Sequence, residues 1–144
     1  MADLVLVRLN KLVNVNSAIE QFYRRYIRCI NERHADLREF VHDTVVYNEK
    51  ELTRLEYQNL IAESVIAAPD IYFDVTILVA DETHIAARIN FHCTPLETFL
   101  GCKPTGKSVA FAEHVFYQLR DGKICQVWSL IDVPAVQHQL NDER

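Results

Sequence analysis

Two carboxylic acids stand within an aromatic part of the sequence, and they are the first candidates for chemistry. Residues 106–132 read GKSVAFAEHVFYQLRDGKICQVWSLID, and the acids are Glu113 and Asp132. A carboxyl group in an apolar pocket has a raised pKa, which suits it to general acid or base catalysis near neutral pH. We therefore interpret both acids as candidate pocket groups, with Trp128 as a wall of the same pocket.

A tight turn sets how these residues face each other. Asp121-Gly122 joins two runs rich in β-branched and aromatic residues, which predicts a type I′ hairpin. Counting from the turn predicts that Val115 lies opposite Trp128 and Glu113 opposite Leu130. Alternation then gives an inner face of Phe111, Glu113, Val115, Tyr117, Gln126, Trp128, Leu130 and Asp132. The outer face would carry Ala112, His114, Phe116, Gln118, Cys125, Val127, Ser129 and Ile131.

Each polar candidate also has a purely structural interpretation. Glu113 is equally suited to an ion pair with a nearby arginine. Asp132 is placed to cap the final helix, which Pro134 opens, by accepting from the amide of Ala135. His42 follows a predicted helix at the pocket mouth, where it is either a base or a histidine stabilised by the helix dipole.

The elements that must position these residues follow from periodicity. Capping boxes at Ser17–Glu20 and Thr53–Glu56 each predict a helix start, with Tyr57 among the residues turned toward the sheet. Expected helices run over 17–30, 35–41 and 53–68, and expected strands over 44–48, 71–79, 84–93 and both arms of the hairpin. Helices followed by strands indicate an α+β fold, with helices on one face of a strongly curved, largely antiparallel sheet that encloses a pocket.

Composition excludes several classes of function. The chain of 144 residues is 49% hydrophobic and 24% charged, which fits one globular domain over 1–144. A net charge of −5 argues against a nucleic-acid surface, and the apolar run 4–7 is too short to span a membrane. The four cysteines show no metal-binding spacing, so we expect reduced thiols, a cytoplasmic location and no metal or cofactor.

Several motifs resemble those of one family. The runs FLGCKPTGKSVAF, FYQLRDGKI and the following VW, with VHDTVVYN and APDIYFDV upstream, resemble SnoaL-like polyketide cyclases of the nuclear-transport-factor-2-like (NTF2-like) superfamily. The resemblance covers residues 15–133 and implies a cone-shaped α+β fold with a central pocket. It also implies a cofactor-free aldol condensation in which a carboxylate removes a proton from carbon.

The resemblance also says where that carboxylate should be. The family's acid falls at Val115 in the predicted register, so its usual place is apolar here. Glu113 is the preceding residue on the same face of the strand and is the expected substitute.

A second comparison concerns the strand over 84–93. The related limonene-epoxide hydrolases have an asparagine and an arginine that correspond to Asn48 and Arg88. They also have two aspartates that correspond to Asn90 and Leu130, so both of their carboxylates are lost in this chain. This resemblance implies that Arg88, Asn90 and His92 face the pocket. Amphipathicity favours the opposite face, with Ile85, Ala87, Ile89 and Phe91 inside. We adopt the inward orientation that the resemblance implies, since a partner subunit can cover the second face of a sheet.

Two functions from different classes remain open. The first is a cofactor-free cyclase, isomerase or dehydratase acting on a small apolar carbonyl compound, with Glu113 as base, Arg88 binding the oxyanion or else neutralising Glu113, and His92 as a further catalytic residue. The second is a small-molecule binding protein without chemistry. Expected substrate-binding residues are Asn48, Asn90, Trp128, Tyr57, Asp132, His42, Val115 and Leu130. We also expect a homodimer that pairs outer sheet faces around His114, Phe116 and Val127.

Overall fold

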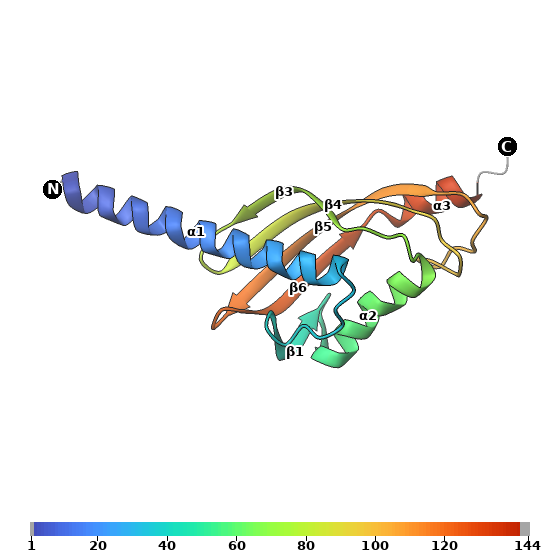
Figure 1. Ribbon diagram of the computed structural model, residues 1–144, viewed down its shortest axis with the longest axis horizontal. Coiled ribbons are helices and arrows are strands. Elements are labelled where there is room, and N and C mark those ends of the chain that lie inside the picture. Colours follow the sequence, from blue (N-terminus) through green and yellow to red (C-terminus); the bar gives the residue numbers. More distant parts are fainter. Residues whose placement is uncertain (1, 142–144) are drawn as a thin grey trace.

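The computed structural model describes residues 2–141, with the side chains of residues 3–9 and 16–141. Its core is a six-stranded sheet in the order β2-β1-β6-β5-β4-β3, crossed on one face by a long helix (Figure 1). The elements are α1 (Ala2–Asn31), β1 (Val41–Tyr47), β2 (Lys50–Thr53), α2 (Arg54–Ala67), β3 (Asp74–Ala80), β4 (His84–Cys93), β5 (Val109–Arg120), β6 (Lys123–Ile131) and α3 (Val133–Asn141). The expected α+β class with a mixed sheet is confirmed.

The sheet is mostly antiparallel, as the hairpin predicted. Only β1 and β6 run parallel among the pairs of described strands. Asp121 and Gly122 have φ values of 52° and 77°, the conformation that a type I′ turn requires and that glycine adopts without strain. The longest pairing joins β4 and β5, and the two central strands of the sheet are β6 and β5.

The helices differ from the predicted ones at the N-terminal end. Ser17 lies inside α1 rather than at its start, and the N-terminal half of α1 extends past the end of the sheet (Figure 1). The expected helix over 35–41 is absent: described residues there form a turn that leads into β1, so His42 is a strand residue. The capping box at Thr53 and Glu56 is confirmed at the start of α2.

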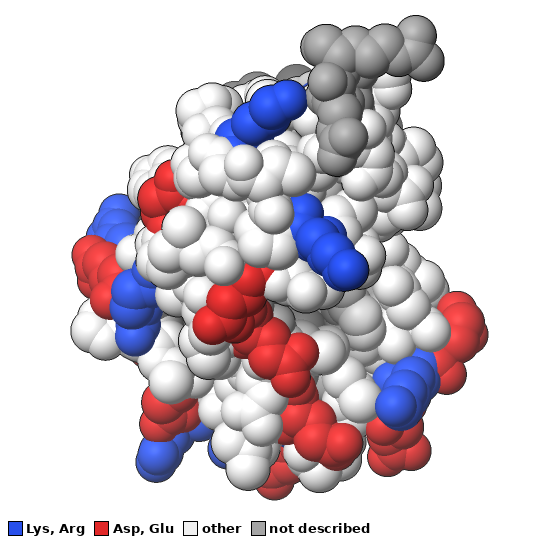
Figure 2. Space-filling view, turned by 90° about the vertical axis from the view of Figure 1, so that its right-hand side faces the viewer, with Lys and Arg blue, Asp and Glu red and all other residues white. Residues whose placement is uncertain are grey.

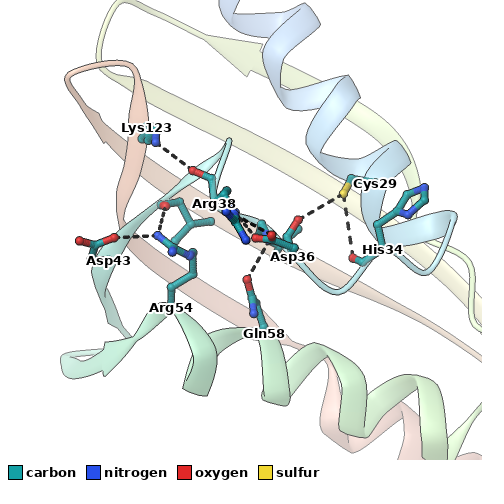
Figure 3. Close-up of polar contacts among 10 residues, drawn as sticks. Cys29, His34, Asp36, Arg38, Asp43, Arg54, Gln58 and Lys123 are labelled. Carbon is teal, nitrogen blue, oxygen red and sulfur yellow. Dashed lines mark hydrogen bonds and ion pairs between the residues drawn. The ribbon is translucent and has the colours of Figure 1, made fainter.

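Polar contacts hold the connection between α1 and β1 against the sheet. The amide of Leu37 donates to Oε1 of Gln58 at 2.8 Å, and Nζ of Lys123 donates to the carbonyl oxygen of Arg38 at 2.9 Å (Figure 3). Arg54 reaches Asp43 at 2.9 Å on the neighbouring strand. The first two contacts link α2 and the β5–β6 hairpin to the segment before β1, which carries no regular structure, and the third links α2 to β1 itself.

Two β-bulges change which residues face the core. In β6, Gln118 pairs with Gln126 and Leu119 with Ile124, so Cys125 is an extra residue. In β3, the pairing jumps from Val75 to Ile77, so Thr76 is an extra residue. An extra residue reverses the alternation beyond it, and every later side chain in that strand therefore moves to the opposite face.

The bulge at Cys125 changes which residues of the hairpin face the core. Val115 lies opposite Ser129 and Glu113 opposite Ile131, one residue away from the predicted register. Val127 and Ile131 therefore line the core, whereas Trp128 and Leu130 lie on the outer face. The expectation that Val127 and Ile131 lie outside and that Trp128 and Leu130 lie inside was wrong. His114 and Phe116 are on the outer face as predicted.

Candidate functional site

An apolar cavity of about 100 Å³ lies between the inner face of the sheet and the two N-terminal helices. Tyr26 of α1, Tyr57 of α2, and Phe99 and Leu100 of the loop before β5 all contribute to its wall. The other lining residues are Ile27, Ile30, Tyr47, Leu60, Ile61, Ser64, Ile71, Phe73, Phe91, Phe111, Glu113, Val115, Tyr117, Val127 and Ile131. Glu113 is the one carboxylic acid among these lining residues.

Glu113 is placed in this cavity by the alternation of β5. Val115 and Tyr117 follow it on the same face, and both are buried. The hydroxyl of Ser129, on the opposed strand, donates a short hydrogen bond to Oε2 of Glu113. Burial raises the pKa of Glu113 above its ordinary value of 4.5, and the Ser129 hydrogen bond offsets part of that rise.

Four buried tyrosines lie close enough to Glu113 for its charge to act on them. The hydroxyls of Tyr26 and Tyr57 lie 2.6 Å apart, and those of Tyr23 and Tyr117 lie 3.1 Å apart. Burial raises the pKa of all four, and the charge of Glu113 raises each of them further. The hydroxyls therefore remain protonated at physiological pH. In each pair one hydroxyl donates to the other, which leaves one O–H of each pair able to donate to a ligand.

The structure keeps Glu113 and Arg88 apart. Arg88 lies on the outer face, where its Nη1 donates to Nε2 of His114 at 2.6 Å. Apolar side chains fill the inner face of β4, as amphipathicity indicated: Ile85, Ala87, Ile89 and Phe91 are all buried. The expectation that Arg88, Asn90 and His92 point into the pocket was therefore wrong. None of the ion pairs among the described residues includes Glu113.

Three further expected site residues, Leu130, Asp132 and Trp128, also lie outside this cavity. Asn90, Leu130 and Asp132 line a separate groove of about 590 Å³ on the outer face, next to Arg88. Asp132 accepts a hydrogen bond from the amide of Ala135 at 3.2 Å, which is the capping interaction predicted as its alternative role. Trp128 is half-buried opposite Phe116 on that same face.

His42 and Asn48 have structural contacts instead of contacts with the cavity. Nε2 of His42 donates to the carbonyl oxygen of Arg120 at 2.6 Å. The side-chain amide of Asn48 brackets the backbone of Ser129, accepting from its N–H at 2.8 Å and donating to its carbonyl oxygen at 3.1 Å. Of the expected set, Glu113, Val115 and Tyr57 line the cavity, and their roles there stay predictions.

Ser129 is the residue that sequence reasoning missed. The predicted register placed it on the outer face, because nothing in the alternating pattern marks Cys125 as a bulge. The structure brings it to the carboxyl group of Glu113 and fixes its backbone through Asn48. No group of three or more histidine, cysteine or acidic side chains within residues 2–141 is arranged to hold a metal ion.

The surface at one end of the molecule carries both signs of charge. Viewed from the end at which α2 and α3 lie, acidic side chains run down the middle of the face and basic ones lie mostly around them (Figure 2). None of the described helices is long and apolar enough to cross a membrane.

Comparisons with known proteins agree with this architecture. The family model of the SnoaL-like polyketide cyclases matches residues 20–140. The structure of a SnoaL-like polyketide cyclase from Agrobacterium tumefaciens is similar at 36% identity and a TM-score of 0.80, over 84% of this chain and 96% of that one. No curated protein matches the chain.

More distant structures share the fold. TsrD from Streptomyces laurentii matches with 18% identity and a TM-score of 0.79, over 86% of this chain and 95% of its own. IdmH from Streptomyces antibioticus matches with 19% identity and a TM-score of 0.74, over 85% and 97%. The NTF2-like fold expected from the sequence is thus confirmed, and the chain belongs to the SnoaL-like polyketide cyclase family.

Proposed function

We propose that the protein is a cofactor-free enzyme that moves a proton on a small, largely apolar carbonyl compound, with Glu113 as the proton-transfer group. The observation that supports this most strongly is a single carboxylic acid, with a raised pKa, in an apolar cavity whose lining includes the protonated tyrosines Tyr26, Tyr57 and Tyr117. A carboxylate with a raised pKa is a stronger base than one in water, which suits it to abstraction from carbon.

The proposed reaction begins at a carbon next to a carbonyl group. The Glu113 carboxylate takes the proton, and the electron pair of the C–H bond moves to the carbonyl oxygen to give an enolate. Tyrosine hydroxyls at the cavity wall donate to that oxygen. Tyr57 is the candidate for this oxyanion-binding role, which the sequence had suggested for Arg88.

The same intermediate accounts for cyclisation or isomerisation. In cyclisation, the enolate carbon attacks a second carbonyl of the same molecule, a C–C bond forms, and the new alkoxide recovers the proton from Glu113. In isomerisation, protonated Glu113 returns the proton to a different carbon. Membership in the polyketide cyclase family supports the first of these.

Proton abstraction can be tested without knowing the natural substrate. Deuterium uptake at the α-carbon of a small aryl ketone, such as 1-tetralone, is followed by NMR in D₂O. We expect the protein to accelerate uptake, and Glu113→Gln to lose about 10²-fold or more of that acceleration. Glu63→Gln, on the exposed surface of α2, is the matched control and should exchange at the wild-type rate.

Two results decide the proposal. A Glu113→Gln variant that exchanges as fast as the wild type would remove Glu113 as the base. Failure of the wild type to accelerate exchange in ketones that it binds would favour the alternative function, a binding protein without chemistry. One observation supports that alternative: Val115, at which the predicted register placed the family's acid, presents only methyl groups to the cavity, and Phe116, which is the actual partner of Trp128, has no carboxyl group either.

A further inference from the structure

A polar hollow of about 370 Å³ lies at the end of the sheet where the β5–β6 hairpin meets the start of β1. Its lining residues come from three parts of the chain: β1, the first turn of α2, and both arms of the hairpin. They are His42, Asp43, Thr44, Arg54, Arg120 and Lys123, and each has a polar side chain. None of these six residues lines the cavity that contains Glu113, so the hollow is a separate feature of the molecule.

Positive charge dominates this hollow. Arg54, Arg120 and Lys123 are cationic at neutral pH, and Asp43 is the single acid among the lining residues. Asp43 pairs with Arg54 at 2.9 Å (Figure 3). The charges of Arg120 and Lys123 therefore have no carboxylate partner within the described part of the chain. This excess of two positive charges contrasts with the net charge of −5 for the whole chain.

Arg120 and Lys123 face each other across the hairpin turn. They are direct partners in the register of β5 and β6, with only Asp121 and Gly122 between them. Like charges at directly opposite positions of an antiparallel pair repel each other and destabilise it. The guanidinium of Arg120 has no hydrogen bond or ion pair with another described residue. An anion bound between these two side chains would replace the repulsion with attraction to both.

The other two cations are held in place by contacts that use only part of their hydrogen-bonding capacity. Nη1 of Arg54 donates to the carbonyl oxygen of Val41 at 3.3 Å as well as to Asp43, and the Arg54 side chain is 26% exposed. Nζ of Lys123 donates to the carbonyl oxygen of Arg38 at 2.9 Å. Because a guanidinium has five N–H donors and an ammonium has three, both groups keep donors for a ligand. Their fixed positions also reduce the entropy that binding would cost.

We propose that this hollow binds a phosphate group, either as inorganic phosphate or as the phosphate of a small ester. A phosphate monoester carries a charge of about −1.5 to −2 at pH 7, which matches the two unpaired charges of Arg120 and Lys123. Its three terminal oxygens can accept hydrogen bonds from cations on different elements, whereas a carboxylate offers two oxygens in one plane. The hydroxyl of Thr44 is a further donor in the lining.

Titration with inorganic phosphate, followed by ¹H–¹⁵N NMR of the intact chain, tests the site directly. We expect saturable shift changes at millimolar phosphate, confined to residues 42–44, 54 and 120–123, and no saturable change with acetate at the same ionic strength. Arg120→Gln should weaken phosphate binding about 10-fold. The variant should fold, because the side chain that it changes is exposed and has no partner among the described residues. Lys103→Gln removes an exposed cation from the loop before β5 and is the matched control, which should bind phosphate as the wild type does.

Glucose 6-phosphate distinguishes the two sources of the phosphate group. Tighter binding than that of inorganic phosphate at the same residues would assign the hollow to an ester, and equal or weaker binding would assign it to inorganic phosphate. The proposal is overturned if neither compound gives a saturable change at these residues. It is also overturned if acetate binds as well as phosphate, or if Arg120→Gln binds phosphate as tightly as the wild type.

Thermal unfolding provides an independent check. A ligand that binds only the native state stabilises it, so phosphate should raise the Tm of the wild type more than that of Arg120→Gln. Without phosphate, the variant should melt at or above the wild-type temperature, because one of two repelling charges is gone. Phosphate also stabilises proteins by its exclusion from their surfaces, so the difference between the two proteins is the informative quantity. Equal rises in Tm with phosphate would contradict a site at Arg120.

Discussion

At the scale of single residues, the account depends on how one carboxyl group is surrounded. Glu113 has the hydroxyl of Ser129 as its hydrogen-bond partner, and the other residues that line the cavity are apolar or phenolic except for Ser64. The ion pair with Arg88, which was the structural alternative for this acid, does not occur because Arg88 bonds His114 on the far face of the sheet. This leaves burial as the dominant influence on its protonation.

The raised pKa of Glu113 predicts how stability depends on pH. Between 4.5 and the pKa in the folded protein, the native state holds the proton more tightly than the unfolded chain does. The free energy of unfolding therefore falls as pH rises through that window. Glu113→Gln cannot ionise, so the variant should gain stability relative to the wild type between pH 4.5 and pH 7.

Urea unfolding of both proteins across that range measures the difference. Glu63→Gln is the control for loss of an exposed carboxylate and should follow the wild-type curve. If Glu113→Gln instead lost stability steadily as pH rose, the carboxylate would be a stabilising partner in the fold and its pKa would be lowered.

At the scale of elements, the β1–β6 pair determines where Ser129 lies. This is a parallel pair with a shift in register between Val41 and Val46, and the side chain of Asn48 bonds the Ser129 backbone just beyond it. Asn48 has a φ of 45°, a conformation that asparagine tolerates better than most residues do. Asn48, first interpreted as substrate-binding, is therefore a clamp that holds the end of β1 to the backbone of β6.

Asn48→Gly tests the clamp because glycine keeps the positive φ and removes both hydrogen bonds. We expect a loss of about 1–2 kcal/mol in the free energy of unfolding, together with slower proton exchange because Ser129 is no longer fixed. Glu49→Gly is the matched control: Glu49 also has a positive φ, of 70°, and should be neutral or slightly stabilised by glycine. Equal behaviour of the two variants would show that the Asn48 side chain does not support the site.

The elements also show what the sequence could and could not predict. Alternation along 84–93 correctly identified Ile85 and Ile89 as core, whereas the family comparison misplaced Arg88, which lies on the outer face beside His114. The Asp121-Gly122 turn was predictable because its chemistry is local. The bulge at Cys125 was not, since it depends on how β6 meets both β1 and β5 and has no residue signature.

At the scale of the whole molecule, the two faces of one sheet differ in burial. The inner face, with α1 and α2, encloses the cavity, whereas the outer face leaves Ile77, Val79, Phe116 and Leu130 exposed. The fold class and family were predictable from motifs spread along the chain. The division of residues between the faces was only partly predictable, because the bulges at Thr76 and Cys125 reverse the faces of the side chains that follow them in β3 and β6.

The pH dependence of deuterium uptake tests the central claim most directly. We expect the exchange rate to rise with pH through one midpoint above 4.5, and NMR titration of the ¹³C-labelled Glu113 carboxyl group to show the same midpoint in the same sample. The exchange rate of the Glu113→Gln variant should not show this rise with pH. A Glu113 carboxyl that titrates at or below 4.5, or an exchange rate that does not follow its titration, would contradict the assignment of Glu113 as the base.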